Sequence, residues 1–108
     1  MGGNSNERSI SLNSGLACLK AIKQLGYNAK IFDPKKNFFN KLKKNKVDLI
    51  FNALHGKDGE DGVAQCFFEH LKIPYTHSGV ISSMNCMDKS ISKQKFLEKK
   101  ILSPKYFE

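Results

Sequence analysis

Apolar residues recur at helical spacing in several parts of the chain. Five of them, three or four positions apart, predict one apolar helix face that ends at Gly26: Leu12, Leu16, Leu19, Ile22 and Leu25. A similar pattern covers residues 63–71, and two further helices are predicted over 81–87 and from Asp88, as N-cap, to about residue 99. A short helix with a lysine-rich outer side is predicted around Phe38, Phe39 and Leu42.

Three segments between these helices are typical of strands. Residues 47–53 are apolar nearly throughout, as expected of a parallel strand that is covered on both faces. Residues 28–32 and 73–76 predict two shorter strands. Alternation of strands and helices indicates an α/β fold with a Rossmann-like parallel sheet and flanking helices.

One strand of that fold is not found in the pattern. The first glycine-rich turn of a Rossmann-like sheet follows an apolar strand that lies inside the sheet. Here the glycines stand at positions 2 and 3. We therefore expect the first strand to be missing, so that residues 28–32 and 47–53 flank an empty lane and Ile31 and Ile50 are poorly buried.

Composition narrows the choice of function. The chain has 108 residues, 40% hydrophobic and 26% charged, which fits at most one ordinary soluble domain. It has neither a membrane-length apolar run nor a secretory signal, which favours a cytoplasmic location and no membrane contact. The net charge of +8 comes almost entirely from dispersed lysines without interleaved aromatics, so nucleic-acid binding is not favoured.

Two residue types are informative by their rarity. The three cysteines show no CxxC or zinc spacing, so we interpret them as small apolar residues in a reducing compartment, and we predict no metal ligands. Arg8 is the only arginine in a lysine-rich chain. Lysine cannot replace the planar guanidinium fork of arginine, so we predict that position 8 requires a guanidinium group.

Residues 54–62 carry the densest candidate chemistry. They join the apolar segment 47–53 to a helix, a junction where unpaired helix N–H groups often meet a ligand. His55 is the second residue of this loop, and five residues would structure it: Gly56, Gly59, Glu60, Asp61 and Gly62. A tight turn with Asp61 as a helix cap is the simpler interpretation. A cap alone requires neither His55 nor three glycines, so the loop predicts a ligand site.

Six short sequences in this order resemble one known family. They are GGNSNERSISLNSG at residues 2–15, ALHG at 53–56, GEDG at 59–62, IPYT at 73–76, SGV at 78–80 and MDK at 87–89. Together they are similar to the N-terminal part of D-alanine–D-alanine ligases, over essentially the whole chain. The resemblance implies residues 1–87 as the substrate-side, pre-ATP-grasp domain and residues 88–108 as the start of the central ATP-grasp domain.

The resemblance also implies an activity. These cytoplasmic enzymes use ATP and Mg²⁺ to join two D-alanines through a D-alanyl phosphate, for peptidoglycan synthesis, and a homodimer is reasonable for the full-length protein. ATP and Mg²⁺ would be held mainly by domains outside this chain, so the fragment alone is expected to be inactive. Whether D-alanine or D-lactate is the second substrate stays open. The alternative is a non-catalytic binding or interaction module with the same fold.

Four residues receive roles from the resemblance. Glu7 would hold the ammonium of the first D-alanine, since charge-assisted hydrogen bonds are strong. His55 would lie beside the reacting carboxylate and steady developing negative charge. Ile10 would line the methyl side of the substrate, and Lys89 would reach ATP phosphates. The structural alternatives are a helix-terminal charge for Glu7, core positions for Ile10 and His55, and a solvated Lys89.

Three positions depart from the family pattern. Ser9 stands where an acid is common, and Cys66 replaces a small residue, usually glycine, at the start of a helix. His77 replaces a glycine in the turn after residues 73–76, where positive φ would strain a histidine. These departures affect the local geometry that we expect.

Overall fold

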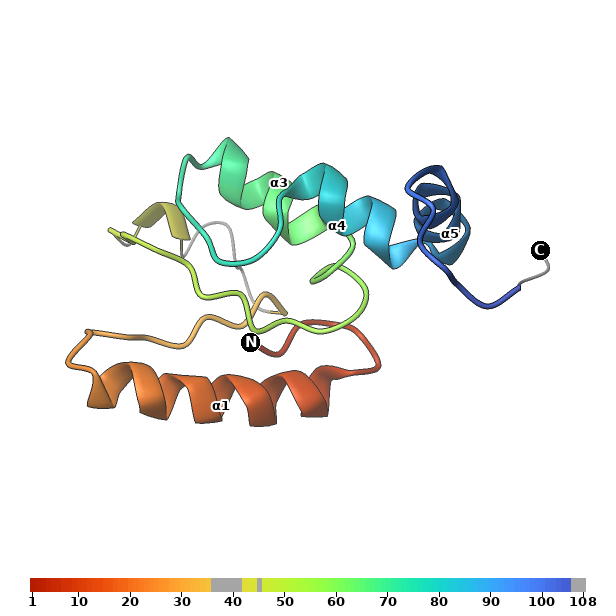
Figure 1. Ribbon diagram of the computed structural model, residues 1–108. Helices are drawn as coiled ribbons and strands as arrows, with labels where there is room; N and C mark the ends of the chain where they lie inside the picture. The colour runs from red at the N-terminus through yellow and green to blue at the C-terminus, as the bar shows by residue number, and fades with distance from the viewer. Residues whose placement is uncertain (36–41, 45, 106–108) are drawn as a thin grey trace.

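The computed structural model describes residues 1–35, 42–44 and 46–105 (Figure 1). Its helices are α1 (Arg8–Gln24), α3 (Val63–His70), α4 (Val80–Met87) and α5 (Lys89–Glu98). They occupy the four longer stretches for which the sequence predicts helices. Of the short helix predicted around Phe38 and Phe39, only residues 42–44 are described, and these are helical; the two phenylalanines lie outside the described residues.

The helix ends follow the local signals. Gly26 has a φ of 87°, which glycine adopts without strain, just beyond the end of α1. The Asp88 carboxylate caps α5 by accepting hydrogen bonds from the backbone N–H groups of Ser90 and Ile91, at 2.9 and 3.1 Å. Both ends were predicted from residue type alone, because caps depend on atoms within one helical turn.

The predicted parallel sheet is not confirmed. Among the described residues the only β-pairing is a single parallel bridge between Ile50 and Tyr75, in which Ile50 N–H donates to Pro74 O at 2.9 Å and Thr76 N–H donates to Ile50 O at 3.0 Å. Residues 28–32 form no ladder with residues 47–53 in the described structure. A strand requires a partner strand for its backbone groups, so an apolar pattern alone does not produce one.

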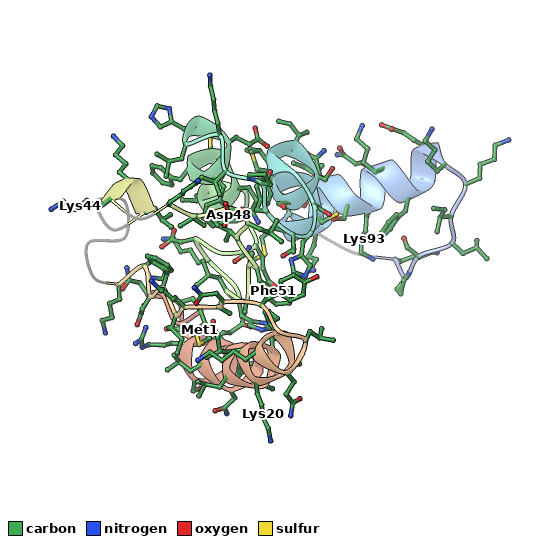
Figure 2. All side chains as sticks on the ribbon, turned by 90° about the vertical axis from the view of Figure 1, so that its left-hand side faces the viewer. Met1, Lys20, Lys44, Asp48, Phe51 and Lys93 are labelled. Atoms are coloured by element: carbon green, nitrogen blue, oxygen red, sulfur yellow. The ribbon has the colours of Figure 1, made fainter. Side chains whose placement is uncertain are left out.

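The core lies between α3 and the segment that leads into the loop 54–62. Its buried members are Leu42, Leu54, Ala64 and Phe68, and the Phe68 ring lies 5.4 Å from that of Tyr75. By contrast, α1 buries only Ser11 and Gly15, and the Met1 side chain packs onto Gly15 (Figure 2). Of the two residues that we expected to be poorly buried, Ile31 is 50% exposed, whereas Ile50 is half-buried and packs against the core.

An ion pair fixes the start of α1. The Arg8 guanidinium donates from Nη1 to Asp33 Oδ1 at 3.1 Å and from Nη2 to Oδ2 at 2.6 Å. Asp33 also accepts from the Gly3 N–H at 3.0 Å. This two-point fork is a contact that lysine cannot make, as the rarity of arginine indicated. The Arg8 hydrogen bonds hold the pKa of the Asp33 carboxyl well below its usual range.

None of the helices in the described ranges is long and apolar enough to cross a membrane.

Candidate functional site

The loop 54–62 is closed by its own hydrogen bonds. The N–H groups of Gly59 and Glu60 donate to Gly56 O at 3.1 and 2.9 Å. In return, the Glu60 carboxylate accepts from the Gly56 N–H at 2.7 Å. Asp61 accepts from the N–H groups of Asp58 and Val63, and so joins the loop to α3. Glu60 and Asp61 thus hold the backbone on which His55 is placed.

Two amide side chains fix the middle of the loop. The side-chain nitrogens of Asn52 and Gln65 both donate to Gly59 O at 3.0 Å. Gly59 itself has no room for a side chain, because an added Cβ would lie 2.4 Å from the Leu54 Cβ. Gln65 is 3% exposed, and its Oε1 accepts no hydrogen bond from the described residues. The loop is therefore anchored to the core on both sides of its turn.

Three serines connect the N-terminal segment and α1 to this loop. Ser5 Oγ donates to His55 O at 2.7 Å, and Ser11 Oγ donates to Ala53 O. Ser14 Oγ lies 2.9 Å from His55 Nε2 and donates to Ile10 O at 3.0 Å. The direction of the Ser14–His55 hydrogen bond depends on the imidazole tautomer; in either direction it holds Nε2 toward Ser14 and leaves Nδ1 facing the other way.

The serines, Asn52 and Gln65 were not singled out from the sequence. Each acts on a partner that the fold brings close, so no local pattern marks it. One signal was present for α1, because Glu7, Ser11 and Ser14 are spaced four and three positions apart and share a helix face.

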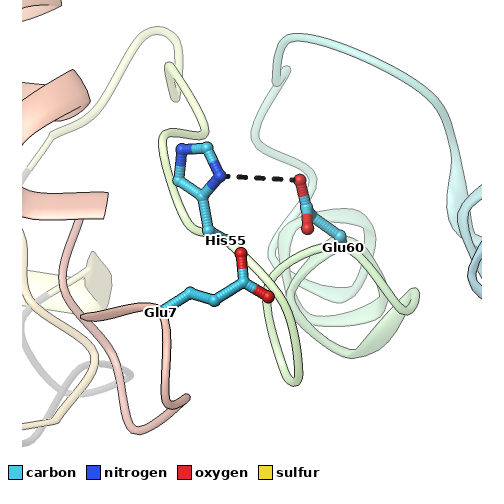
Figure 3. Close-up of side chains that lie close together, drawn as sticks. All are labelled: Glu7, His55 and Glu60. Atoms are coloured by element: carbon cyan, nitrogen blue, oxygen red, sulfur yellow. Dashed lines mark ion pairs between the residues drawn. The ribbon is translucent and has the colours of Figure 1, made fainter. Parts of the chain in front are cut away.

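Glu7, His55 and Glu60 meet in one cluster (Figure 3). One ligand atom from each lies within 4.8 Å of the others, and His55 Nδ1 is 3.9 Å from Glu60 Oε1. Gly56 lies against Glu7, since a Cβ there would be 2.8 Å from Glu7 Oε1, and its φ is 68°. The positive φ favours glycine at this position, and the missing side chain lets the Glu7 carboxylate lie directly against the backbone.

Two members of the cluster, His55 and Glu60, border cavities, whereas Glu7 is exposed at the surface and lines neither cavity. His55 lines two cavities, of about 250 and 390 Å³. The larger one also contains Ser14 and Glu60. Two carboxylates beside an imidazole suit a cationic group such as an ammonium. Mg²⁺ prefers an all-oxygen octahedron, so the three side chains together are a poor fit for it.

The other two residues with predicted roles lie outside this cluster. Lys89 is exposed at the first position of α5, and no described contact joins it to Glu7 or His55. The Ile10 side chain is 53% exposed on α1 and lines neither cavity.

The departures from the family pattern have distinct local effects. His77 has a φ of 78°, the left-handed region expected for a glycine position. Its Nδ1 lies 2.8 Å from Thr76 Oγ1, and its ring packs edge-on against Phe51 with centroids 5.7 Å apart. Ser9 and Cys66 are exposed. The strain at position 77 is thus accompanied by contacts that a glycine would not make.

Comparisons with known proteins match this chain to one family. The family description "D-ala D-ala ligase N-terminus" matches residues 28–78. The D-alanine–D-alanine ligase of Pelagibacter ubique (strain HTCC1062) is 52% identical over 105 residues, which cover 97% of this chain and 34% of that protein. The resemblance to the D-alanine–D-alanine ligases is confirmed. The chain corresponds to their N-terminal region.

Other relatives agree. D-alanine–D-alanine ligase B of Brucella suis biovar 1 is 49% identical over 94 residues, or 87% of this chain and 30% of the relative. The crystal structure of the Bacillus anthracis D-alanine–D-alanine ligase complexed with ATP has a TM-score of 0.85 at 36% identity, over 97% of this chain and 36% of that one. The chain thus shares the fold of solved ligases and spans about a third of the length of its relatives.

Proposed function

We propose that this chain is the substrate-side part of a D-alanine–D-alanine ligase, which joins two D-alanines at the expense of ATP for peptidoglycan synthesis. The observation that carries the proposal is the meeting of Glu7 and His55, from distant parts of the sequence, in one cluster. The similarity to ligases over nearly the whole chain supports it. The alternative of a non-catalytic module has no comparable support.

The cluster suggests how the first D-alanine is held. The Glu7 carboxylate accepts hydrogen bonds from the substrate ammonium, and Glu60 adds a second negative charge nearby. Ser14 orients the His55 imidazole, which steadies negative charge on the substrate carboxylate as it reacts. Gly56 permits close approach of the backbone. ATP supplies the phosphoryl group when bound, and Lys89 is the residue of this chain that we assign to its phosphates.

Several further features belong to the same proposal. Residues 1–87 form the substrate-side domain, and residues 88–108 begin the central ATP-grasp domain; residues 106–108 lie outside the described structure. Mg²⁺ would bind outside the Glu7–His55–Glu60 cluster, because those side chains fit it poorly. The complete enzyme would act in the cytoplasm, where ATP is available, and as a homodimer without nucleic-acid or membrane partners.

A chimera tests the proposal. Residues 2–105 replace the matched residues of the Pelagibacter ubique relative, whose remaining domains are retained. We expect ATP-dependent formation of D-alanyl-D-alanine. Glu7→Gln should lower kcat/KM for D-alanine by about ten- to hundred-fold, because a charge-assisted bond is lost. His55→Ala should lower kcat more than it raises KM.

The matched control is Glu98→Gln, which removes an exposed carboxylate of α5 that pairs only with Lys95 among the described residues. It should leave both constants unchanged. A folded chimera without dipeptide synthesis would overturn the assignment of the activity. A fully active chimera in which Glu7→Gln and His55→Ala behave like the control would overturn the assignment of the site.

A further inference from the structure

The backbone at His77 adopts a conformation that its place in the chain does not explain. Four residues other than glycine have a positive φ within the described structure: Asp58, Lys72, His77 and Lys100. Lys72 and Lys100 each stand one residue beyond the C-cap of a helix, where left-handed residues are common, and aspartate tolerates this region. His77, with a φ of 78°, ends no helix and lies in the connection that leads into α4. Backbone strain of this kind clusters at functional sites.

The His77 ring is held in place by two neighbours. Its Nδ1 lies 2.8 Å from Thr76 Oγ1, which also accepts a hydrogen bond from the Asn52 N–H at 3.1 Å. The Phe51 ring packs edge-on against the imidazole, with an angle of 77° between the two planes. These contacts occupy Nδ1, whereas Nε2 has no hydrogen-bond partner among the described residues. The ring is therefore fixed in a position from which Nε2 can meet a ligand.

His77 and His55 line the same cavity of about 390 Å³. Each histidine follows one of the two segments that are joined by the parallel bridge between Ile50 and Tyr75. Parallel segments end at the same edge, so the bridge brings both imidazoles to the side where ligands bind in open α/β folds.

The wall of this cavity next to His77 suits an anionic group. Ser78 and Ser82 line it, so the N-terminal turn of α4 borders the cavity, and no side chain of the described residues caps that helix. An uncapped helix N-terminus and an imidazole N–H both favour negative charge. The carboxylates of the neighbouring cluster, Glu7 and Glu60, favour the opposite charge. An amino acid, which carries both charges, fits this division.

We propose that His77 is a substrate-binding residue, whose Nε2–H donates a hydrogen bond to the carboxylate of the first D-alanine. This inference rests on the proposed function. A carboxylate has two oxygens and about four acceptor positions, so a second donor beside His55 has a lone pair to bind. An imidazole that accepts from Thr76 at Nδ1 carries its proton on Nε2, as the role requires. A glycine at this position would relieve the strain but supply no donor.

The chimera described above provides the test, with the variants His77→Gly and His77→Asn. Glycine and asparagine both adopt a left-handed backbone readily, and neither carries an imidazole. Each variant should lower kcat/KM for D-alanine by about ten- to hundred-fold, because a hydrogen bond to a charged group is lost.

Lys72→Gly is the matched control for the backbone. Lys72 also has a positive φ, of 54°, but it stands beyond the end of α3 and lines neither cavity. This variant relieves the same kind of strain and should leave kcat/KM for D-alanine unchanged.

Two competitive inhibitors separate a binding role from a structural one. The phosphonate analogue of D-alanine keeps the ammonium and the methyl group and carries an anionic phosphonate in place of the carboxylate. D-alaninamide keeps the ammonium and the methyl group but has no anionic group. His77→Gly should raise the inhibition constant of the phosphonate at least about tenfold and leave that of the amide nearly unchanged. A general disturbance of the cavity would raise both alike.

The outcomes distinguish this inference from the proposed function. A folded chimera that makes no dipeptide overturns the proposed function, and the role of His77 falls with it. In an active chimera, wild-type kcat/KM for both His77 variants, or equal weakening of the two inhibitors, would overturn the role of His77 alone.

A size limit is the remaining explanation for a ring at this position. If His77→Gly used D-2-aminobutyrate faster and D-alanine as before, the ring would only restrict the substrate side chain, and this also overturns the proposal. If His77→Gly fails to fold, the same comparisons are made with His77→Asn.

Discussion

The loop 54–62 differs from the two extended segments beside it, residues 28–32 and 47–53, in how its backbone groups are hydrogen-bonded. The space between these two segments is called the lane. The loop forms backbone hydrogen bonds within itself, whereas Leu49 and Phe51 of the segment 47–53 make no backbone hydrogen bond within the described structure. Gly56, Glu60 and Gly59 are bonded within the loop or to Asn52 and Gln65. A β-ladder on the unpaired side of residues 49–51 would require another extended segment. Local hydrogen bonds therefore define the site, whereas the sheet depends on partners distant in sequence.

The largest expected difference concerns burial. Phe68 is 1% exposed beside the loop, and Phe68→Ala should cost about 3–5 kcal/mol of unfolding free energy through lost transfer and a cavity. Ile31→Ala should lower the unfolding free energy by less than about 1 kcal/mol, because Ile31 is half exposed beside the lane. Urea denaturation of the two variants measures both values. Equal losses would mean that the lane is packed in solution.

The next largest loss of stability is expected from a substitution at Gly59, where there is no room for a side chain. Gly59→Ala forces a Cβ against Leu54 and should destabilise by about 1–3 kcal/mol. Gly79→Ala is the matched control, since its nearest neighbour would be 3.7 Å away and its φ of −71° is open to any residue. If Gly59→Ala were as stable as Gly79→Ala, the loop would have to accommodate the added methyl group without a loss of stability.

The smallest expected effect concerns the ion pair between Arg8 and Asp33. Because Arg8 lowers the pKa of Asp33 in the folded chain, the stability from this pair is present above the usual carboxyl pKa, near 4. It is lost as the pH falls below that value toward the folded pKa. Asp33→Asn should lower Tm at pH 7 by about 4–8 °C and remove this part of the acid dependence. Thermal unfolding of both proteins between pH 2 and pH 7 checks it; parallel pH curves would contradict it.

The same contrast explains what could be predicted from sequence. The ends of α1 and α5 depend on Gly26 and Asp88, which act within one turn, so both were predicted correctly. The loop was predicted to be a ligand site from its own residues, and two of them, His55 and Glu60, lie beside Glu7 in the structure. The sheet was not obtained, because Leu49 and Phe51 need a partner that their pattern does not specify. Ser14 was missed since its role depends on His55, far along the chain.

Residue-resolved amide hydrogen exchange of the 108-residue chain tests the comparison most directly. The N–H groups of Leu54, Gly56 and Glu60 are hydrogen-bonded, whereas those of Leu49 and Phe51 make no bond in the described structure. After correction for intrinsic rates, the first three should exchange at least about tenfold more slowly than the other two. Equal protection of both groups would contradict the account, because it would mean that the lane is already paired or that the loop is not held.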